Sequence, residues 1–340
     1  MRFKHLVIIA ITIASLALTS CAAISRTIEQ AKPEPVETNV LSGREGVNGP
    51  VLVVKIDDTN LAHPQIGLED ADVVYIEQVE GGLTRLAAVF SSKVPIEVGP
   101  VRSARISDIE ILSQFGRVAF AYSGAQKKLL PVIAAANLQN LGAQAQPPTI
   151  YTRDPTRINP YSMVLRGDLL MTKVIEKGYL VDTAKSVGWS FGQAPAAGVV
   201  VTSATIHWPA ARYGAEWSSR DKCWLLLHNS KPDYVRTGKQ LCPTTLVIQR
   251  VLITASEYYD KVGGVTPLSH TVGTGSGFIL RDGKAYAGTW VRTSPDLGTT
   301  WTSADGSEIA FAPGQVWVAL TDTAPDFTYP IPQASASATK

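Results

Sequence analysis

The sequence predicts an α+β protein in which a mixed α/β N-terminal domain precedes a β-rich C-terminal domain. Strand-like apolar runs and stretches of helical spacing mix before about residue 186, and strand-like runs dominate after it. Residues 192–198, Gly-Gln-Ala-Pro-Ala-Ala-Gly, are typical of a loop or domain joint. With 340 residues, 45% of them hydrophobic, the chain has enough apolar material for two ordinary domains, which we place at residues 50–190 and 191–325.

The first 20 residues are typical of a secretion signal. Arg2 and Lys4 form a short positive region, and residues 6–18 follow without a charge. A helix of this length reaches only about 20 Å, which is too short to cross a hydrocarbon core of roughly 30 Å. We therefore predict a cleaved signal peptide over residues 1–20.

A cysteine follows small residues at the end of the apolar run. Residues 18–21, Leu-Thr-Ser-Cys, resemble the lipobox of bacterial lipoproteins. The resemblance implies cleavage before Cys21 and a diacylglyceryl thioether on it, which anchors the protein to the outer face of the cell membrane. An ordinary signal peptide that contains a cysteine is the alternative. Residues 21–49, with prolines at 33 and 35, are predicted to form a flexible tether.

The N-terminal domain begins with a buried strand at residues 51–56, which ends in Asp57 and Asp58. Residues 72–80 and 83–91 flank Gly81-Gly82, which predicts a two-residue hairpin that pairs Glu80 with Leu83. Glu80 and Arg85 would then be diagonal neighbours on one face. The later elements predicted here are a helix at 106–115, a strand at 118–122, and helices at 127–138 and 162–179.

The C-terminal domain is predicted to consist of strands. Asp282-Gly283 separates two of them and indicates a second hairpin. Residues 326–340 form a tail. The strand-like runs cover 199–207, 223–228, 245–254, 277–281, 284–292 and 308–319.

Two cysteines remain for a disulfide once Cys21 is acylated. An exported compartment permits disulfides. A bond between Cys223 and Cys242 would close a loop of about twenty residues and stabilise the fold by roughly 3 kcal/mol. We predict this bond. A catalytic thiol is the alternative, although neither cysteine stands in a recognised nucleophile context.

The charge balance argues against nucleic acid as a partner. Lys and Arg number 31 and Asp and Glu 29, so loss of two cations with the leader leaves 29 of each sign. Nucleic-acid binding requires a concentrated positive surface. The partners we expect are the membrane, through the lipid anchor, and an acidic cell-wall or peptide ligand.

Charged side chains concentrate on the short connections of residues 55–105. Arg102 and Arg105 are three apart, so they share one side of the first helical turn, beside free backbone N–H groups. This arrangement suits an anion or carboxylate site. A charge network that neutralises the arginines and an acid–base catalytic site are the alternatives. The candidate residues are Asp57, Asp58, Glu77, Glu80, Arg85, Arg102 and Arg105, with Arg153 on a later loop.

Metal and cofactor sites are not predicted. Asp57 and Asp58 are adjacent on a strand, so their side chains point to opposite faces and at most one enters a given site. The five histidines are scattered, without an H-E-x-x-H pair. The chain also has no G-x-S-x-G elbow, P-loop or dinucleotide fingerprint, which leaves enzyme activity uncertain and disfavoured.

Several strings follow one another in an order that resembles the YerB-like bacterial lipoproteins, a family built around a domain of unknown function. The resemblance implies a mixed α/β domain and a β-rich domain on a lipid anchor, and no established reaction. The strings are KIDD at 55–58, AHPQIGL at 62–68, ADVVY at 71–75, VEGGLTR at 79–85, VGPVRSAR at 98–105 and YTRD at 151–154.

The function we expect is that of a lipid-anchored, extracytoplasmic protein of the cell envelope. It would act as a binding or scaffolding module, with an anion or carboxylate site at Arg85, Arg102 and Arg105. The alternative is an envelope hydrolase that uses acidic residues of the N-terminal domain.

Overall fold

The structure, a computed structural model, describes residues 36–331. The predicted signal peptide, Cys21 and most of the predicted tether lie outside the described residues. Of the described residues, 38–331 belong to one compact unit. Within the described part of the chain, no helix has the length and apolarity needed to span a bilayer.

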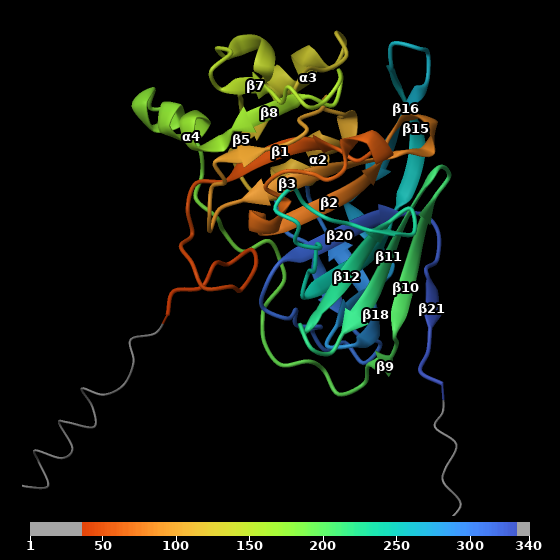
Figure 1. Cartoon of the computed structure of the whole chain (residues 1–340). Coiled ribbons are helices and arrows are strands. Elements are labelled where there is room, and N and C mark those ends of the chain that lie inside the picture. Colours follow the sequence, from red (N-terminus) through yellow and green to blue (C-terminus); the bar gives the residue numbers. More distant parts are fainter. Residues whose placement is uncertain (1–35, 332–340) are drawn as a thin grey trace, which may run out of the picture. The chain divides into compact units, whose positions relative to one another are not determined.

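One mixed sheet runs through this unit and takes strands from both predicted domains (Figure 1). Strand β2 (Val73–Gln78) pairs antiparallel with β3 (Thr84–Phe90), and on its other side lies β20 (Val316–Thr321), parallel to it. The other strands are β1 (Leu52–Asp57), β5 (Val118–Ala121), β6 (Leu138–Asn140), β9 (Val199–Val200), β14 (Thr245–Arg250), β17 (Gly273–Arg281), β18 (Lys284–Arg292) and β19 (Thr300–Thr302). Their order is β19-β18-β17-β14-β20-β2-β3-β1-β5-β6, with β9 against β18.

Three smaller sheets and three α-helices complete the described fold. The five-stranded sheet holds β10 (Ser203–Trp208), β11 (Ala211–Ser218), β12 (Cys223–His228), β13 (Lys231–Pro232) and β21 (Asp326–Thr328). A second contains β4 (Glu97–Val98), β7 (Tyr151–Arg153) and β8 (Met163–Arg166), and β15 (Leu252–Tyr259) pairs with β16 (Val265–His270). The helices are α2 (Ile106–Ser113), α3 (Leu130–Ala135) and α4 (Gly167–Glu176), and short 3₁₀ helices are η1 (Asn60–Ala62), η2 (Leu68–Asp70), η3 (Glu80–Gly82) and η4 (Ala143–Ala145).

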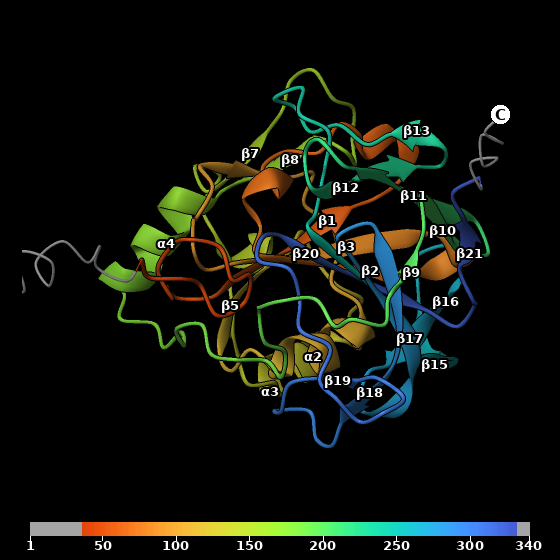
Figure 2. The ribbon, with the colours of Figure 1, turned by 90° about the horizontal axis from the view of Figure 1, so that it is seen from below.

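The central sheet is covered on both faces. Alternate residues of β1 point to opposite sides, with Val54 in one hydrophobic cluster and Val53 in the other. The first cluster includes β8, α4 and the five-stranded sheet, and the second includes α2 and α3. In Figure 2 the central strands accordingly lie between β7, β8 and β12 on one side and α2 and α3 on the other. Burial on both faces explains why four of the six residues of β1 are apolar.

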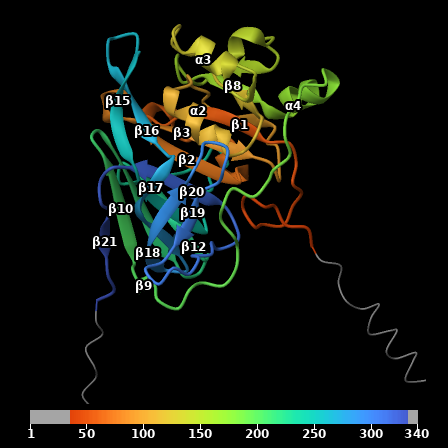
Figure 3. The same ribbon diagram turned by 180° about the vertical axis from the view of Figure 1, so that it is seen from behind.

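The β15–β16 hairpin packs against α2, as seen from behind in Figure 3. The backbone N–H of Ser269 donates to the hydroxyl of Ser107 at 3.0 Å. This contact ties a C-terminal hairpin to the helix that begins just after the arginine-rich turn of residues 98–105. Part of the candidate site therefore depends on residues far along the chain.

The register predicted for the β2–β3 hairpin is wrong by one residue. Glu77, not Gln78, is the partner of Arg85, and Glu80 lies in the turn η3 rather than in the strand. The loop has three residues because Val79 pairs with Leu83, which places Glu80 in the turn together with Gly81 and Gly82, whose φ values are 68° and 70°. The predicted diagonal contact of Glu80 with Arg85 is therefore absent from the paired strands.

Other local predictions have mixed outcomes. The Asp282-Gly283 hairpin is confirmed, because Arg281 pairs with Lys284 across a two-residue turn. The predicted helix at 162–179 is corrected: its first residues form β8, and only Gly167–Glu176 is helical. Residues 326–328, placed in the predicted tail, pair with β10.

The end of the predicted tether also packs on the folded unit. Leu41 is fully buried, and the hydroxyl of Ser42 donates to Asp72 at 2.8 Å. A flexible tether would leave such an apolar side chain in water, where it is less stable than in the core. The prediction of a flexible tether is therefore wrong for residues 38–49, which pack on the folded unit.

The α+β prediction holds in part. All three described α-helices precede residue 180, and residues 199–331 contain strands without an α-helix among the described residues. The chain is nevertheless mostly β, because several short stretches expected to be helical or irregular pair as strands. The two predicted domains share the central sheet through the β2–β20 pairing.

Cys223 and Cys242 are joined by a disulfide, 19 residues apart in sequence. We expect the double variant Cys223→Ala/Cys242→Ala to lose about 3 kcal/mol of unfolding free energy, because its unfolded chain regains the entropy of the opened loop. Urea unfolding followed by tryptophan fluorescence measures this loss. Dithiothreitol should destabilise the wild type by a similar amount and leave the double variant unchanged. Equal stability of oxidised and reduced wild type would contradict the prediction.

Candidate functional site

Two clusters of charged and polar residues meet at the end of β1. Asp57 and Asp58 are adjacent there, and the side chains of both are fully shielded from solvent. Their contacts lie on opposite faces of the sheet, as predicted from strand alternation. A buried carboxylate is costly unless charged or hydrogen-bonded partners compensate it. The partners of Asp57 belong to the arginine cluster, and those of Asp58 to the histidine cluster, both defined below.

The arginine cluster begins with two guanidinium groups that share one carboxylate. Arg85 is the cross-strand partner of Asp57, and its Nη1 lies 3.5 Å from Asp57 Oδ1. Arg102 pairs through Nε with Asp57 Oδ2. The turn that carries Arg102 is held on β1, because the Arg102 N–H donates to the carbonyl of Lys55 at 2.8 Å. Asp57 thus fixes two arginines that are distant in sequence.

A third arginine completes this cluster at the start of α2. Arg105 donates from Nε and Nη2 to Glu80 Oε2, at 3.0 and 2.7 Å. Thr266 of β16 donates to the other oxygen of Glu80. Burial opposes ionisation of Glu80, but the hydrogen bonds and charge of Arg105 outweigh it and lower the pKa of this carboxyl. The arginine cluster therefore comprises Asp57, Glu80, Arg85, Arg102 and Arg105.

A buried lysine lies behind the arginine cluster with two carboxylates. Lys55 contacts both Glu77 and Asp108, and all three side chains are inaccessible to solvent. One ammonium cannot neutralise two buried carboxylates. Burial and the charge of Asp108 raise the pKa of Glu77 to about 7, although Lys55 and Arg105 oppose this rise. Glu77 consequently retains a proton at a pH where a free glutamate is ionised.

The three arginines of the cluster differ in their access to solvent. The exposed fraction of the side chain is 7% for Arg85, 25% for Arg102 and 16% for Arg105. Burial, together with the positive charges of Arg102 and Arg105, lowers the pKa of Arg85 despite the pull of Asp57. The Nε of Arg85 is buried and has no hydrogen-bond partner among the described residues. The cluster thus keeps one unsatisfied donor and two arginines that water can reach.

The fourth arginine singled out from the sequence lies apart from these contacts. Arg153 ends β7 and donates to Asn159 and Ser162, on the loop that follows. The same loop carries Tyr161, whose ring centroid lies 5.9 Å from the guanidinium carbon of Arg102. This distance is within the range of a cation–π contact. The loop therefore reaches the arginine cluster through Tyr161 rather than through Arg153.

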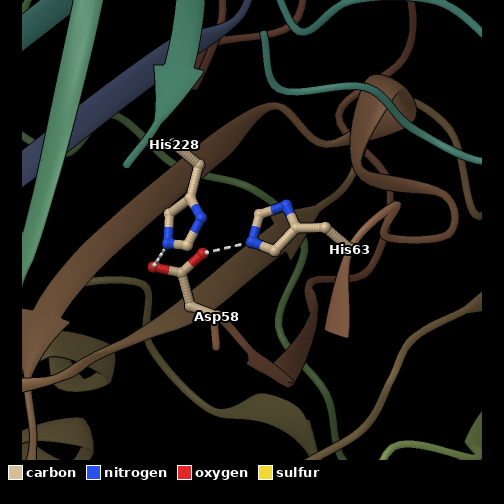
Figure 4. Close-up of side chains that lie close together, drawn as sticks. All are labelled: Asp58, His63 and His228. Atoms are coloured by element: carbon tan, nitrogen blue, oxygen red, sulfur yellow. Dashed lines mark ion pairs between the residues drawn. The ribbon is translucent and has the colours of Figure 1, made fainter. Parts of the chain in front are cut away.

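The histidine cluster gathers around Asp58 on the opposite face (Figure 4). The Nε2 of His63 lies 3.5 Å from Asp58 Oδ1, and the Nε2 of His228 lies 4.0 Å from Asp58 Oδ2. The two imidazole rings are stacked, with centroids 4.1 Å apart. One ligand atom from each of the three residues lies within 4.8 Å of the others, so this set could hold a metal ion.

Further polar groups surround these three side chains. Tyr213 on β11 donates its hydroxyl to Asp58 Oδ1 at 2.6 Å, and Thr84 donates to Oδ2 at 2.5 Å. The Nδ1 of His63 lies 2.9 Å from Asp233 Oδ1, and the side-chain amide of Gln65 lies 3.2 Å from its Nε2. The histidine cluster therefore comprises Asp58, His63, Gln65, Thr84, Tyr213, His228 and Asp233.

The two histidines have opposite electrostatic environments. Burial disfavours the charged form of His63, but its hydrogen bonds and charge contacts with Asp233 and Asp58 raise its pKa to about 10. Burial and the neighbouring positive charge of His63 lower the pKa of His228, against the pull of Asp58. Burial also raises the pKa of Asp233. Without another cation, the cluster therefore holds its positive charge on His63.

Sequence reasoning missed the histidine cluster. The sequence indicates Asp58 as a candidate, but its scattered histidines do not indicate His63 or His228. His63 and its partner Asp233 are 170 residues apart, and Tyr213 and Asp58 are 155 apart. The available signal was His63 within five residues of Asp58, beside a predicted strand end. Nothing local identifies His228, which ends an apolar strand of the other half of the chain.

Comparison with known proteins identifies related chains over two stretches. Residues 38–180 match the N-terminal domain, and residues 204–318 the C-terminal domain, of the family described as "Protein of unknown function (DUF3048)". The chain is 24% identical over 330 residues to "Putative lipoprotein YerB" of Bacillus subtilis (strain 168), a match that spans 93% of this chain and 94% of the relative.

The fold is also similar to a solved one. The crystal structure of the YerB protein from Bacillus subtilis superposes with a TM-score of 0.74 at 18% identity, covering 86% of this chain and 99% of that one. At this identity the likeness establishes the fold alone. The comparisons confirm the family resemblance found in the sequence strings.

The buried lysine group has a testable pH dependence. The pKa of Glu77 is raised from 4.5 to about 7, so between these values the folded protein retains a proton that the unfolded chain releases. The stability that this proton contributes is therefore complete below about pH 4.5 and is lost as the pH rises through about 7. Glu77→Gln cannot ionise, so we expect its melting temperature to fall less between pH 5 and 7.5, by a few degrees. Thermal unfolding followed by circular dichroism measures the melting temperatures of the wild type and of Glu77→Gln at each pH. The exposed Glu176→Gln should behave as wild type, and an unaltered pH difference in Glu77→Gln would contradict the assignment.

Proposed function

This chain belongs to the YerB-like DUF3048 family, and from that premise we propose that it is a lipid-anchored protein of the cell envelope that binds an acidic ligand at its arginine cluster. The predicted signal peptide and lipobox cysteine, Cys21, support the anchor. The name of the Bacillus relative, a putative lipoprotein, agrees with it. Anchoring through Cys21 would place the folded unit outside the cytoplasm, at the outer face of the cell membrane.

One observation carries the ligand proposal: three guanidinium groups face two carboxylates, and two of these groups reach solvent. Among the described residues, Arg85, Arg102 and Arg105 form ion pairs with Asp57 and Glu80 alone, which leaves one positive charge in excess. The neighbouring Lys55 group is neutral when Glu77 holds its proton. The excess charge therefore remains available to an anion at the exposed edges of Arg102 and Arg105.

The carboxylates of the cluster prepare the arginines for a ligand. Asp57 holds Arg102 by its Nε, and Glu80 holds Arg105 by its Nε and one terminal nitrogen. Both side chains are therefore ordered before a ligand arrives, which reduces the entropy cost of binding. Guanidinium groups fixed in this way suit the planar carboxylates of cell-wall peptides or of a protein partner.

The alternative drawn from the sequence is an envelope hydrolase that uses Asp57, Asp58, Glu77 or Glu80. A general acid or base must come within hydrogen-bond reach of the substrate. Asp57 and Glu80 face arginines, Asp58 accepts bonds from hydroxyls, and Glu77 is inaccessible to solvent. These contacts favour binding over hydrolysis by the acidic residues.

The binding proposal is tested with Arg102→Ala in the full chain. Disaccharide-peptides released from purified peptidoglycan by a muramidase serve as the acidic probe, and isothermal titration calorimetry measures affinity. Loss of one charge-assisted contact should weaken binding by about 10- to 100-fold. The matched control is Arg220→Ala, whose side chain is 89% exposed and contacts Asp221 alone among the described acidic residues.

Two outcomes would contradict this function. The first is a wild type that does not bind the probe while Arg102→Ala lowers only the melting temperature, which would make the arginine cluster a purely structural network. The second is turnover of the probe that a carboxylate substitution abolishes with binding intact, which would establish the hydrolase. Arg102→Lys keeps the charge but lacks the fork geometry, so it should recover only part of the affinity.

A further inference from the structure

We propose that Asp58, His63 and His228 form a binding site for a divalent transition-metal ion, with Zn²⁺ as the best-suited ion. The site is independent of the arginine cluster, because it lies on the opposite face of the sheet at the end of β1. Its ligands are two imidazole nitrogens and one carboxylate, a donor set that zinc commonly takes in proteins.

One donor–donor distance in the set is that of a bound ion, and the other is a few tenths of an ångström longer. A tetrahedral zinc ion with bonds of about 2.0–2.2 Å holds its donors roughly 3.3–3.6 Å apart. The Nε2 of His63 lies 3.5 Å from Asp58 Oδ1, and the Nε2 of His228 lies 4.0 Å from Oδ2. Figure 4 shows both nitrogens directed toward the same carboxylate. The rings are stacked with 18° between their planes, so one imidazole must tilt out of the stack before both nitrogen lone pairs converge on one ion.

The surroundings orient these ligands as the outer shell of a metal site does. Asp233 contacts Nδ1 of His63 at 2.9 Å, which leaves Nε2 as the nitrogen that faces Asp58. Metal-binding histidines commonly donate their second N–H to a carboxylate in this way. Tyr213 donates to Asp58 Oδ1 and Thr84 to Oδ2, so both carboxylate oxygens that face the histidines are also held by a hydroxyl. Asp58, His63 and His228 thus each place one donor atom within 4.8 Å of the others, and Asp233, Tyr213 and Thr84 contact them from outside this set.

Unsatisfied oxygens beside the ligands provide a second, independent observation. Oε1 of Gln65 and Oδ2 of Asp233 are buried and have no hydrogen-bond partner within the described residues 36–331. Both residues are at least 98% buried and contact His63 through their other polar atom. Buried acceptors without donors are costly. A metal ion and its bound water would supply the missing positive charge and donors.

The charge of the cluster favours a dication. Asp58 and Asp233 bring two negative charges into a region where neither side chain touches solvent. The stacked rings of His63 and His228 disfavour a positive charge on both at once. One divalent ion bound by neutral imidazoles balances both carboxylates. Imidazole ligands select Zn²⁺ and similar ions over Mg²⁺ and Ca²⁺, which prefer oxygen.

The chelator-treated full chain, titrated with Zn²⁺ by calorimetry, tests this site. We expect one equivalent to bind the wild type and to raise its melting temperature. His63→Gln and His228→Gln should lose this binding, and Asp233→Asn should weaken it by about 10- to 100-fold. The control His207→Gln, on an exposed histidine paired with Asp326, should bind as the wild type does. Arg102→Ala should also keep its Zn²⁺ affinity.

A spectrum of the wild type keeps the test independent of how the variants fold. Co²⁺ bound by the three ligands and water should give the intense visible absorption of tetrahedral coordination, and Zn²⁺ should displace it. Weak octahedral absorption, or Zn²⁺ binding that is equal in wild type, His63→Gln and His228→Gln, would overturn the site. Absence of Zn²⁺ binding by the folded wild type would overturn it as well.

Discussion

The burial of two adjacent carboxylates at the end of β1 is the constraint on which the organisation of this protein depends. Asp57 and Asp58 point to opposite faces of a sheet that is covered on both sides, so neither can be solvated by water. Each face must then supply its own charged or hydrogen-bonding partners for the carboxylate buried there. Arginines provide them on one face, and hydroxyls and imidazoles provide them on the other. Much of the polar architecture follows from this single requirement.

The compensation on the two faces draws on different parts of the chain. The arginine cluster comes mainly from residues 57–105, with one contact from Thr266 of the β15–β16 hairpin. The histidine cluster needs Tyr213 and His228, which reach Asp58 because the five-stranded sheet packs over that face of β1. Residues from both matched family regions therefore meet in one cluster. The β2–β20 pairing joins the same two regions within the central sheet.

Sequence reasoning identified the arginine cluster because its members are close in sequence and lie on predicted short connections. It placed Glu80 wrongly, since a register error of one residue moves a side chain to the other face of a strand. The turn is closed by Val79 and Leu83 and includes Glu80, so Glu80 leaves the strand and contacts Arg105 instead of Arg85. The number of residues in a turn depends on backbone torsions and on the pair of residues that closes it, so two glycines in the sequence do not define its length.

The sequence by itself determined the local features: the adjacent carboxylates at a strand end, most strand positions, the pair of cysteines, and the leader and lipobox that predict export and anchoring. These depend on neighbours a few residues apart. Only the tertiary structure decided which charges pair, which arginines reach water, and that His63, His228 and Asp233 gather at Asp58. Electrostatic compensation depends on distance in space, and that distance is set by how the sheets pack rather than by separation along the chain.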